Sequence, residues 1–410
     1  MKANSIICIV GLGYVGYPEA VTLSKYFKVI GYDIDSSKIQ TLNQANTITN
    51  LYMTNNPEDI AKADFVIISV PTPVDEFKTP DLSFVESASD TVGKYMKENA
   101  IVILESTVYP EVTEEIMVPI LERESGYKCG VDFKVAYSPE RINPGDSQHD
   151  IRKVTKVVSG MDKETTDQVC RLYDFVALNT FKAKNIKTAE AVKVTENVQR
   201  DMNIALINEL SFVFKPMGID VGDVVDAAST KWNFYKCYPG MVGGHCIPVD
   251  PYYLTYKSEK LGYSPKLIHE GRAVNDSMPK RVADMVIAAL HNREARILIA
   301  GLTYKEDVDD IRESPAKYLV KELEPYGVNM VGYDPLLENI EGKFNIGLIN
   351  DLFHLKDIDC IIFTVAHRVF KDIGLSNFRS ITTDNPVLVD VKGCFERSEA
   401  VGLGFKYLTL

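Results

Sequence analysis

The sequence predicts an α/β protein with two doubly wound, Rossmann-like domains joined by a long central helix. Three observations predict this. The first 160 residues alternate short, β-branched apolar runs with amphipathic segments, a pattern typical of βαβ units. A long segment with helical periodicity follows, and the strand–turn–helix pattern then begins again near the C-terminus. The predicted domains are residues 1–186, 187–294 and 295–410.

The first domain is expected to contain a parallel sheet whose strands each end in a glycine-rich or polar segment. Since parallel strands point the same way, these endings gather along one edge, where open α/β sheets bind their ligands. That edge is therefore the predicted ligand site. The expected strands are Ile6–Val10, Val29–Tyr32, Phe65–Val70, Ile101–Glu105 and Lys134–Tyr137.

The middle of the chain is predicted to be helical. Apolar residues recur every three or four positions from Lys187 to Met217, which favours one long connecting helix. Helical character resumes from Arg272 to Leu290, after a stretch rich in glycine and proline from Trp232 to Leu254. A loop of that length inside a compact protein is more often functional than idle.

The last domain echoes the first. ILIAGLTY, from Ile297, resembles ICIVGLGY, from Ile7, and VGYDP, from Val331, resembles IGYDI, from Ile30. Within each pair, the second copy follows the first after a similar number of residues. A second doubly wound domain is therefore predicted.

Composition excludes several protein classes. Apolar residues make up 45% and charged residues 25%, as in ordinary globular proteins. A net charge of −12 disfavours binding to nucleic acid but still permits a small phosphorylated ligand. The seven cysteines are scattered, which favours a reducing compartment over a disulfide framework. Since no run approaches the roughly 20 apolar residues that span a bilayer, we expect no membrane partner and a cytoplasmic location.

The turn after the first strand has the pattern of a dinucleotide site. Gly11 permits a tight turn, Gly13 lets a pyrophosphate approach the backbone, and Gly16 allows close packing of helix on strand. Asp33 ends the next strand, where a carboxylate accepts hydrogen bonds from ribose hydroxyls and repels a 2′-phosphate. NAD is thus favoured over NADP. The alternative is a glycine turn that binds no dinucleotide.

The corresponding turn in the last domain differs. It runs from Gly301 to Lys305, lacks the middle glycine and has gained a lysine. A cation at such a turn suits a diphosphate, so we predict a second nucleotide-like ligand here, facing the first. A solvated surface lysine is the alternative.

Cys246 is the predicted nucleophile. Most isolated cysteines are inert small apolar residues. Here the flanking glycines free backbone N–H groups to polarise sulfur or an oxyanion, and Asp250, four residues on, is a candidate base. Zinc held by Cys237, His245 and Cys246 is disfavoured, because adjacent residues rarely ligate one tetrahedral ion, and no metal is predicted.

Lys193 and Asn197 lie four residues apart on the long helix, so they share a face and are candidate donors to one substrate atom. The alternative is a solvated charged stripe. Its other members are Glu190, Glu196 and Arg200. Thr107 and Glu140 follow predicted strands at the ligand edge, but neither carries a strong signal alone.

Taken together, these residues resemble the nucleotide-sugar 6-dehydrogenase family, which includes UDP-glucose, GDP-mannose and UDP-N-acetylhexosamine dehydrogenases. Seven ordered segments spread over nearly the whole chain carry the resemblance. They are GLGYVG at Gly11, VPTP at Val70, EST at Glu105, SPERINPG at Ser138, AEAVKVTEN at Ala189, GGHCIPVDP at Gly243 and GLTYKEDVDDIRESP at Gly301.

The resemblance implies an N-terminal NAD-binding domain, a C-terminal UDP-binding domain and a helical dimerisation region around the long helix. Cys246 is the implied nucleophile, with acid–base or oxyanion roles for Lys193, Asn197 and Asp250 and water handling by Thr107 and Glu140. The implied cofactor residues are Gly11, Gly13, Tyr14, Val15, Gly16, Asp33, Lys38, Pro71, Thr72, Ser106, Thr107 and Lys305. The implied substrate residues are Glu140, Arg141, Lys193, Asn197, Tyr238, Gly240, Gly243, Arg272, Lys305 and Arg312, with Arg272 reaching the substrate of a neighbouring subunit.

Departures from the family narrow the expected substrate. UDP-glucose dehydrogenases usually carry serine before the nucleophile and lysine before the aspartate, where this chain has His245 and Val249. The segment GGHCIPVDPYYL resembles the corresponding segment of UDP-N-acetylglucosamine and UDP-N-acetylgalactosamine dehydrogenases of surface-polysaccharide pathways. Enzymes for UDP-N-acetylmannosamine more often have tryptophan at the position of Tyr252. The gluco and galacto epimers both stay open, with UDP-N-acetylmannosamine or UDP-glucose as alternatives.

The implied reaction is a four-electron oxidation of the sugar C6 hydroxyl to a uronic acid by NAD, through a thiohemiacetal and a thioester on Cys246. A two-electron hydroxyacid-type dehydrogenase is a more remote alternative, because it leaves the cysteine loop and the second nucleotide-like domain without a task. A non-catalytic NAD sensor or scaffold protein is another.

Overall fold

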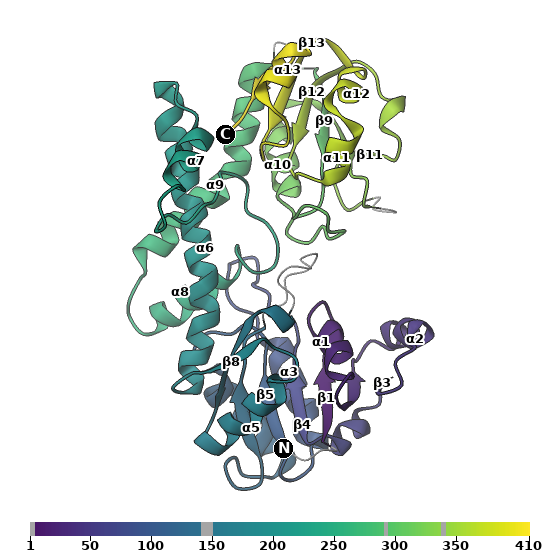
Figure 1. Cartoon of the computed structure of the whole chain (residues 1–410), viewed down its shortest axis with the longest axis vertical. Coiled ribbons are helices and arrows are strands. Elements are labelled where there is room, and N and C mark those ends of the chain that lie inside the picture. The colour runs from purple at the N-terminus through teal and green to yellow at the C-terminus, as the bar shows by residue number, and fades with distance from the viewer. Residues whose placement is uncertain (1–4, 141–150, 291–293, 338–341) are drawn as a thin grey trace. The chain divides into compact units, whose positions relative to one another are not determined.

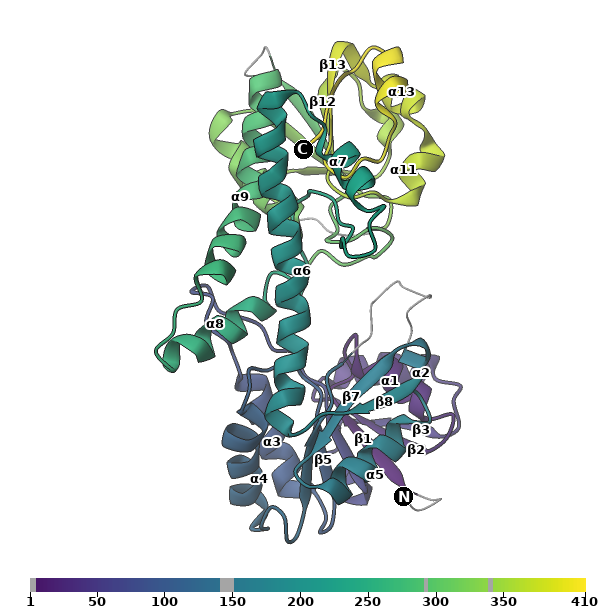
Figure 2. The ribbon, with the colours of Figure 1, turned by 60° about the vertical axis from the view of Figure 1, so that its left-hand side comes forward.

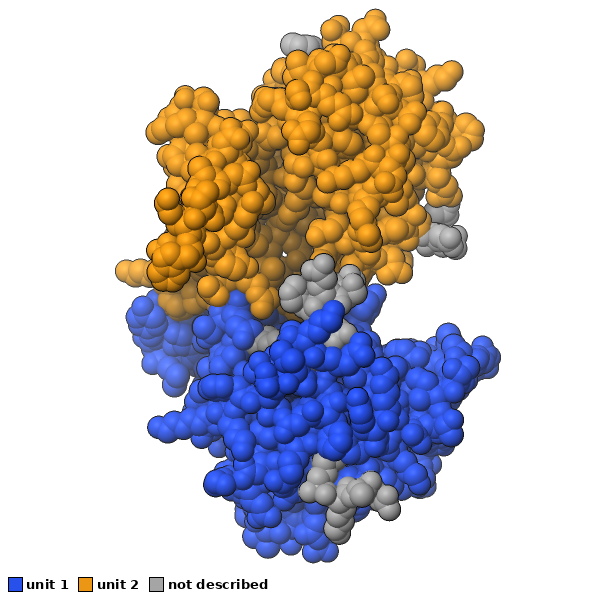
Figure 3. Space-filling model, in the orientation of Figure 1, with its two compact units in different colours: residues 1–197, 249–264 blue, residues 198–248, 265–410 orange. Residues whose placement is uncertain are grey.

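The computed structural model describes residues 5–140, 151–290, 294–337 and 342–410. The chain forms two compact units, coloured separately in Figure 3. Unit 1 comprises Met1–Asn197 and Val249–Ser264, and unit 2 comprises Val198–Pro248 and Pro265–Leu410. The division into three domains stays a prediction.

Unit 1 is built on one twisted sheet of eight strands (Figure 1). The strands are β1 Ile6–Val10, β2 Lys28–Tyr32, β3 Leu51–Thr54, β4 Phe65–Ile68, β5 Ile101–Leu104, β6 Lys134–Tyr137, β7 Thr155–Gly160 and β8 Asn179–Lys182. Their order is β3-β2-β1-β4-β5-β6-β7-β8, with parallel pairing except between β6 and β7. The first six strands therefore have the order of a dinucleotide-binding fold.

The expected strands of this sheet are present, but β4 and β5 end earlier than predicted. The prediction carried β4 to Val70, whereas the Val70 N–H leaves the ladder and donates to Ser106 Oγ at 3.0 Å. Likewise, β5 ends at Leu104 rather than Glu105. Strands β3, β7 and β8 were not expected.

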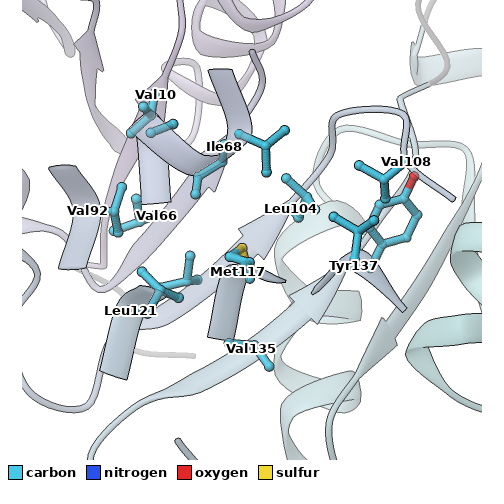
Figure 4. Packing of buried hydrophobic residues seen from close by; sticks show 14 of the residues in the cluster. Val10, Val66, Ile68, Val92, Leu104, Val108, Met117, Leu121, Val135 and Tyr137 are labelled. Atoms are coloured by element: carbon cyan, nitrogen blue, oxygen red, sulfur yellow. The ribbon is translucent and has the colours of Figure 1, made fainter. Parts of the chain in front are cut away.

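Helices cover both faces of this sheet. Alternate residues of β1 enter two separate cores: Cys8 and Val10 pack on one face, Ile7 and Ile9 on the other. Figure 4 shows the first core, where strand residues such as Val66 and Leu104 meet Val92 and Leu121 from two helices. The helical elements are α1 Gly16–Leu23, α2 Ser36–Ala45, η1 Pro57–Lys62, α3 Ser83–Tyr95, η2 Thr113–Met117, α4 Val118–Ser125, η3 Ile151–Lys153, α5 Lys163–Tyr173 and α8 Asp250–Lys260.

Unit 2 contains the predicted second sheet. Its strands are β9 Arg296–Ala300, β10 Asn329–Tyr333, β11 Gly347–Ile349, β12 Ile358–Phe363, β13 Thr382–Asp390 and β14 Lys406–Leu408. The order β11-β10-β9-β12-β13-β14 is all parallel and repeats that of the first six strands of unit 1. Its short helices are α10 Pro315–Leu323, η5 Glu324–Tyr326, η6 Leu352–His354, α11 Arg368–Ile373, α12 Leu375–Arg379 and α13 Arg397–Gly402.

The long helix is α6, Ile186–Phe214, which Figure 2 shows as one continuous helix. The short helix η4, Lys215–Met217, follows it, because Pro216 cannot continue the α-helical ladder. Unit 2 also holds α7, Val221–Ala228, and α9, Lys266–Ala289, which begins six residues before the predicted Arg272. Among the described helices, none is long and apolar enough to cross a membrane.

One helix replaces part of the predicted loop. The loop from Trp232 was expected to reach Leu254, but α8 already begins at Asp250. Pro251 lies in its first turn, where a missing N–H breaks no intrahelical hydrogen bond. The proline therefore marks the start of a helix rather than the continuation of a loop.

Candidate active site

The sheet register of unit 1 brings the predicted strand ends together at one edge. Val10 pairs with both Tyr32 and Ile68, Ile68 pairs with Leu104, and Leu104 pairs with Tyr137. The carboxyl ends of five strands are thus level, and the polar segments that follow them begin at one edge. The strand order reverses between β1 and β4, which is where such sheets bind their ligands.

The glycine turn after β1 fits a dinucleotide. Gly11 has φ +96°, and a Cβ there would lie 2.5 Å from the Ser69 carbonyl oxygen. A Cβ on Gly16 would lie 1.9 Å from the Gly11 carbonyl oxygen, so only glycine permits this packing of α1 on β1. A Cβ on Gly13 would meet nothing within 4 Å. The backbone at Gly13 is therefore open to a ligand while the two flanking glycines hold the turn closed.

Asp33, at the end of β2, is buried and ordered by three hydrogen bonds. Its Oδ2 accepts from the Leu12 N–H at 2.9 Å and from Lys38 Nζ at 2.8 Å, and its Oδ1 accepts from the Asp35 N–H. The carboxylate is thus fixed beside the glycine turn, as a ribose acceptor requires. Lys38, a predicted cofactor residue, is its counterion.

The other predicted cofactor residues of unit 1 lie along the same edge. Ser106 is buried, and its hydroxyl accepts from the Val70 N–H and donates to the Val70 carbonyl oxygen. These two hydrogen bonds connect the segments that follow β4 and β5. The remaining residues are exposed or half-buried: Tyr14, Val15, Pro71, Thr72 and Thr107.

Lys193 and Asn197 on α6 are 4% and 1% exposed, which excludes the solvated stripe for these two residues. Lys193 Nζ donates to Glu140 Oε2 at 3.0 Å, and Asn197 Nδ2 donates to Asp250 Oδ2. One buried face of α6 therefore holds two of the predicted catalytic carboxylates, one from the end of β6 and one from the start of α8. Spacing along α6 predicted the shared face but not these partners.

Two acceptor atoms of this group are left without a partner. Among the described residues, Glu140 Oε1 and Asn197 Oδ1 are buried and accept no hydrogen bond. An unsatisfied buried polar atom costs about 1–3 kcal/mol, so such atoms are typical of sites that receive a ligand or water.

Behind this edge lies a buried charged cluster that the sequence did not reveal. Lys156 on β7 lies 2.5 Å from Glu105 Oε1 and 4.0 Å from Glu19 Oε1. Tyr173 donates its hydroxyl to the same Glu105 oxygen at 2.6 Å. Lys156 Nζ also lies 3.4 Å from the Pro139 carbonyl oxygen, so it contacts the segments that carry Thr107 and Glu140. Glu105 within the EST segment was the only available signal.

The loop that carries Cys246, residues 239–246, is called the cysteine loop and belongs to unit 2. The Cys246 side chain is half-buried. Gly240 exchanges two hydrogen bonds with the Asn208 side chain of α6, at 2.8 and 3.0 Å, which fixes one end of the loop. A Cβ on Gly243 would lie 2.5 Å from Pro315 Cδ, so the loop packs directly on the start of α10. Tyr238 donates to Asp226 Oδ1. Asn208 was not predicted, although it lies eleven positions after Asn197, close to three helical turns.

The second glycine turn reproduces the first at the level of hydrogen bonds. Gly301 has φ +93°, and Leu302 donates its N–H to Asp334 Oδ2 at 2.6 Å, as Leu12 does to Asp33. The buried His367 also contacts Asp334 Oδ2, through Nε2 at 3.2 Å. The partner of this carboxylate is thus fully buried, whereas Lys38, the partner of Asp33 in the first turn, is partly exposed. The VGYDP echo contains Asp334, but nothing in the sequence pointed to His367.

The remaining predicted residues differ in their surroundings. Lys305 is half-buried just after the second turn, and Arg312 pairs with Asp310 at 2.7 Å. Arg272 is buried and donates to Asp201 Oδ1 at 2.5 Å and to Asp276 within the same unit. Its predicted reach into a neighbouring subunit stays a prediction. Arg141 lies outside the described residues.

Three family models cover the chain in order. Residues 5–177 match the NAD-binding domain of the UDP-glucose/GDP-mannose dehydrogenase family, residues 187–277 its central domain, and residues 298–397 its UDP-binding domain. The family description, the glycine turn and Asp33 agree that NAD is the cofactor.

Relatives match over nearly the full length. The protein CapL of Staphylococcus aureus is 44% identical over 414 residues, or 97% of each chain. A UDP-N-acetyl-D-glucosamine 6-dehydrogenase of Pseudomonas aeruginosa is 44% identical over 94% of this chain and 96% of its own. Among solved structures, a UDP-D-ManNAc dehydrogenase from Pyrococcus horikoshii superposes with a TM-score of 0.89 at 30% identity, over 98% of both chains. The chain therefore belongs to the UDP-glucose/GDP-mannose dehydrogenase family of NAD-dependent nucleotide-sugar dehydrogenases.

Proposed function

We propose that this enzyme oxidises the C6 hydroxyl of a UDP-N-acetylhexosamine, with the gluco or galacto configuration, to the corresponding uronic acid. The full oxidation transfers four electrons in two hydride steps, and its product suits the synthesis of surface-polysaccharide precursors. The observation that carries the proposal is the pair of open acceptors, Glu140 Oε1 and Asn197 Oδ1, in a buried group of acids and donors. A hydroxyl group and an attacking water are the partners that these atoms lack.

When bound, NAD⁺ would supply the hydride acceptor for each oxidation. Asp33 and the Gly11–Gly16 turn hold the cofactor by its ribose and pyrophosphate. Asp250, fixed by Asn197, removes the proton of the C6 hydroxyl in the first oxidation. These residues thus bind and orient the cofactor and deprotonate the C6 hydroxyl. The first oxidation leaves an aldehyde at C6.

The Cys246 thiolate then adds to the aldehyde carbon. Its C–S bond forms as the carbonyl oxygen becomes an oxyanion, which Lys193 and Asn197 stabilise. Loss of the second hydride converts this thiohemiacetal into a thioester. Glu140, with Thr107, takes a proton from the water that cleaves the C–S bond, and this step releases the carboxylate and restores the thiol.

Chain connectivity supports the assignment of Cys246. Asp250 lies only four positions after it, so their Cα atoms lie within about 14 Å of each other. The thiol is half-buried, whereas Cys8, Cys170, Cys360 and Cys394 are buried. Burial raises the pKa of the Cys170 thiol and holds those of the other three well above the usual range, which makes them poor nucleophiles.

The relatives favour an N-acetylglucosamine substrate. The Pseudomonas relative that is 44% identical is named for UDP-N-acetyl-D-glucosamine, whereas the Pyrococcus structure named for UDP-D-ManNAc is 30% identical. UDP-N-acetylmannosamine and UDP-glucose are the alternative substrates.

The test is to incubate the enzyme and NAD⁺ separately with UDP-GlcNAc, UDP-GalNAc, UDP-ManNAc and UDP-glucose and to follow NADH absorbance. We expect the fastest turnover with one of the first two sugars and about two NADH per sugar consumed. A ratio of one would support a two-electron dehydrogenase. Cys246→Ser should lose carboxylate formation, and undiminished turnover by this variant would refute the covalent mechanism.

We also propose that the enzyme is a homodimer joined through the helical region. Unit 2 exposes large apolar side chains there, among them Leu206 on α6, Leu267 on α9 and Trp232, which is 97% exposed. Trp232 is the only tryptophan of the sequence, so intrinsic fluorescence reports on its surroundings. Emission should shift to the red as the protein is diluted below its dissociation constant, in parallel with the mass measured by light scattering.

A further inference from the structure

The cysteine loop, residues 239–246, is attached to the loop that follows β9, residues 303–314. Both loops belong to unit 2. His245 Nε2 lies 2.9 Å from Asp310 Oδ2, and the Gly244 N–H donates to the Glu313 carbonyl oxygen at 3.2 Å. The residue directly before Cys246 is thus held by the loop that carries Lys305 and Arg312.

Tyr304 closes this contact from the other side. Its ring lies edge-on to the His245 imidazole, with 5.5 Å between the ring centroids. Gly244 has φ +89°, and a Cβ there would lie 2.7 Å from the Tyr304 ring. Glycine is therefore required both by the backbone angle and by the tyrosine. The Tyr304 N–H donates to the Asp310 carbonyl oxygen at 2.9 Å, so the two residues that flank His245 are also joined to each other.

Asp310 is suited to hold His245 permanently. Burial alone would raise the pKa of this carboxyl, but hydrogen bonds from His245 and Arg312 outweigh burial and hold the pKa well below its usual range. Arg312 contacts Asp310 through its backbone N–H, Nε and Nη2, at 2.7–3.1 Å. Since an ionised carboxylate only accepts hydrogen bonds, His245 Nε2 must carry the hydrogen.

The base of the same loop is fixed in the second glycine turn. Thr303 donates its N–H to Asp334 Oδ2 at 3.2 Å, and the Asp307 N–H donates to His367 Nδ1 at 2.9 Å. The loop therefore connects the UDP-binding turn at one end with His245 at the other, through hydrogen bonds that all lie within one unit.

We propose that His245 is a positioning residue that couples occupation of the UDP-binding loop to the orientation of Cys246. The proposal rests on the proposed function, because it takes Cys246 as the nucleophile, and it adds a role for the histidine that precedes it. A nucleotide that contacts Lys305 or Arg312 moves or orders the loop, and the Asp310–His245 contact transmits this change to the thiol. His245 itself touches neither substrate nor cofactor in this account.

The experiment measures how fast iodoacetamide alkylates Cys246 in the full-length protein, with and without saturating UDP. The rate is read by mass spectrometry from fragment ions that contain Cys246 but not Cys237, which lies on the same tryptic peptide. We expect UDP to change the wild-type rate by about fivefold or more, the usual lower range for coupled sites. A wild-type rate that UDP leaves unchanged would overturn the proposal.

Matched variants separate positioning from folding. His245→Gln keeps an N–H donor for Asp310 and should keep the UDP effect, whereas His245→Leu keeps the bulk without a donor and should lose it. Both variants should still bind UDP in calorimetry, because neither change touches the nucleotide, and alkylation is compared at a UDP concentration that saturates each protein. A His245→Leu enzyme that retains the UDP effect would overturn the proposal.

A double-mutant cycle tests the contact itself. If Asp310 acts on Cys246 through His245, adding Asp310→Ala to His245→Leu should change the alkylation ratio no further. Independent effects of the two changes would refute the coupling. In turnover, His245→Leu should lower kcat and leave KM for NAD⁺ unchanged. Alkylation needs no catalysis, so the coupling can be established even if the NADH ratio refutes the four-electron reaction.

Discussion

The Lys156 ammonium lies 2.5 Å from the Glu105 carboxylate, and both side chains are fully buried behind the cofactor edge of unit 1. Glu19 completes the cluster, and burial followed by repulsion from Glu105 raises its pKa well above the usual range. Burial also raises the pKa of Glu105, but the charge of Lys156 outweighs burial and lowers the pKa of that carboxyl. The ammonium of Lys156 is thus paired with the Glu105 carboxylate, while the surroundings of Glu19 favour its neutral form.

Replacing Lys156 should destabilise the protein strongly. Lys156→Met leaves the Glu105 charge buried without a counterion, which typically costs about 3–5 kcal/mol of unfolding free energy. The measurement is denaturant unfolding followed by circular dichroism. The double variant Lys156→Met, Glu105→Gln should recover most of the loss, because it removes both charges of the pair. Equal stability of the single and double variants would show that the pair is not what stabilises this region.

Glu190 should make stability depend on pH. This carboxyl lies on α6 and accepts hydrogen bonds from the Thr113 N–H and hydroxyl and the Glu111 N–H, yet burial raises its pKa to about 7. The folded protein then binds a proton more tightly than the unfolded chain does. The stability that the neutral form provides is therefore complete below pH 4.5, the ordinary value, and is lost as pH rises through 7.

The comparison variant is Glu190→Gln, which has nearly the same shape and no titration. Unfolding free energy should fall between pH 5 and pH 8 by up to about 3 kcal/mol more in wild type than in the variant. Denaturant melts at several pH values give this difference. Parallel pH profiles for the two proteins would mean that Glu190 is already ionised at pH 5.

The regular strands could be predicted because their apolar runs are unbroken, as in IICIV from Ile6 to Val10. The missed strands lack that signal for identifiable reasons. β7 carries Lys156 in its interior, and its partner Glu105 lies elsewhere in the sequence. β8 exposes most of its residues at the edge of the sheet, so it has no apolar run at all.

Residues of the candidate site could be predicted where they form a motif close together in the sequence. Hydrogen-bond partners that are far apart in the sequence could not be predicted. The glycine turn and Asp33 follow from neighbouring strands, and Lys193 and Asn197 follow from helical spacing. Their partners Glu140 and Asp250 each lie 53 positions away, and Asp310 lies 65 positions from His245. Separations of this kind are fixed by topology and packing, which composition and periodicity do not encode.

Asp33 should control cofactor binding. Asp33→Asn removes the charge that pairs with Lys38 and that we propose accepts hydrogen bonds from the ribose. Hydrogen bonds to charged groups are worth about 1.5–3 kcal/mol. KM for NAD⁺ should therefore rise by about 10- to 100-fold, with a smaller change in KM for the sugar. The matched control is Glu98→Gln, an exposed residue before β5 at the opposite end of the sheet. Equal effects of the two substitutions would exclude a specific role for Asp33.

Glu140 should act in the last chemical step, the release of the acid. Glu140→Gln keeps the size of the side chain beside Lys193. It removes the carboxylate that we propose takes a proton from water. The two oxidations should proceed, so we expect a burst of about two NADH per active site followed by a slow steady rate. Stopped-flow absorbance gives the burst, and mass spectrometry of the Cys246 peptide should find the sugar attached as a thioester. Hydroxylamine, a stronger nucleophile than water, should release it and restore turnover. A uniform loss of rate without a burst would instead place Glu140 before the thioester, in hydride transfer or substrate binding.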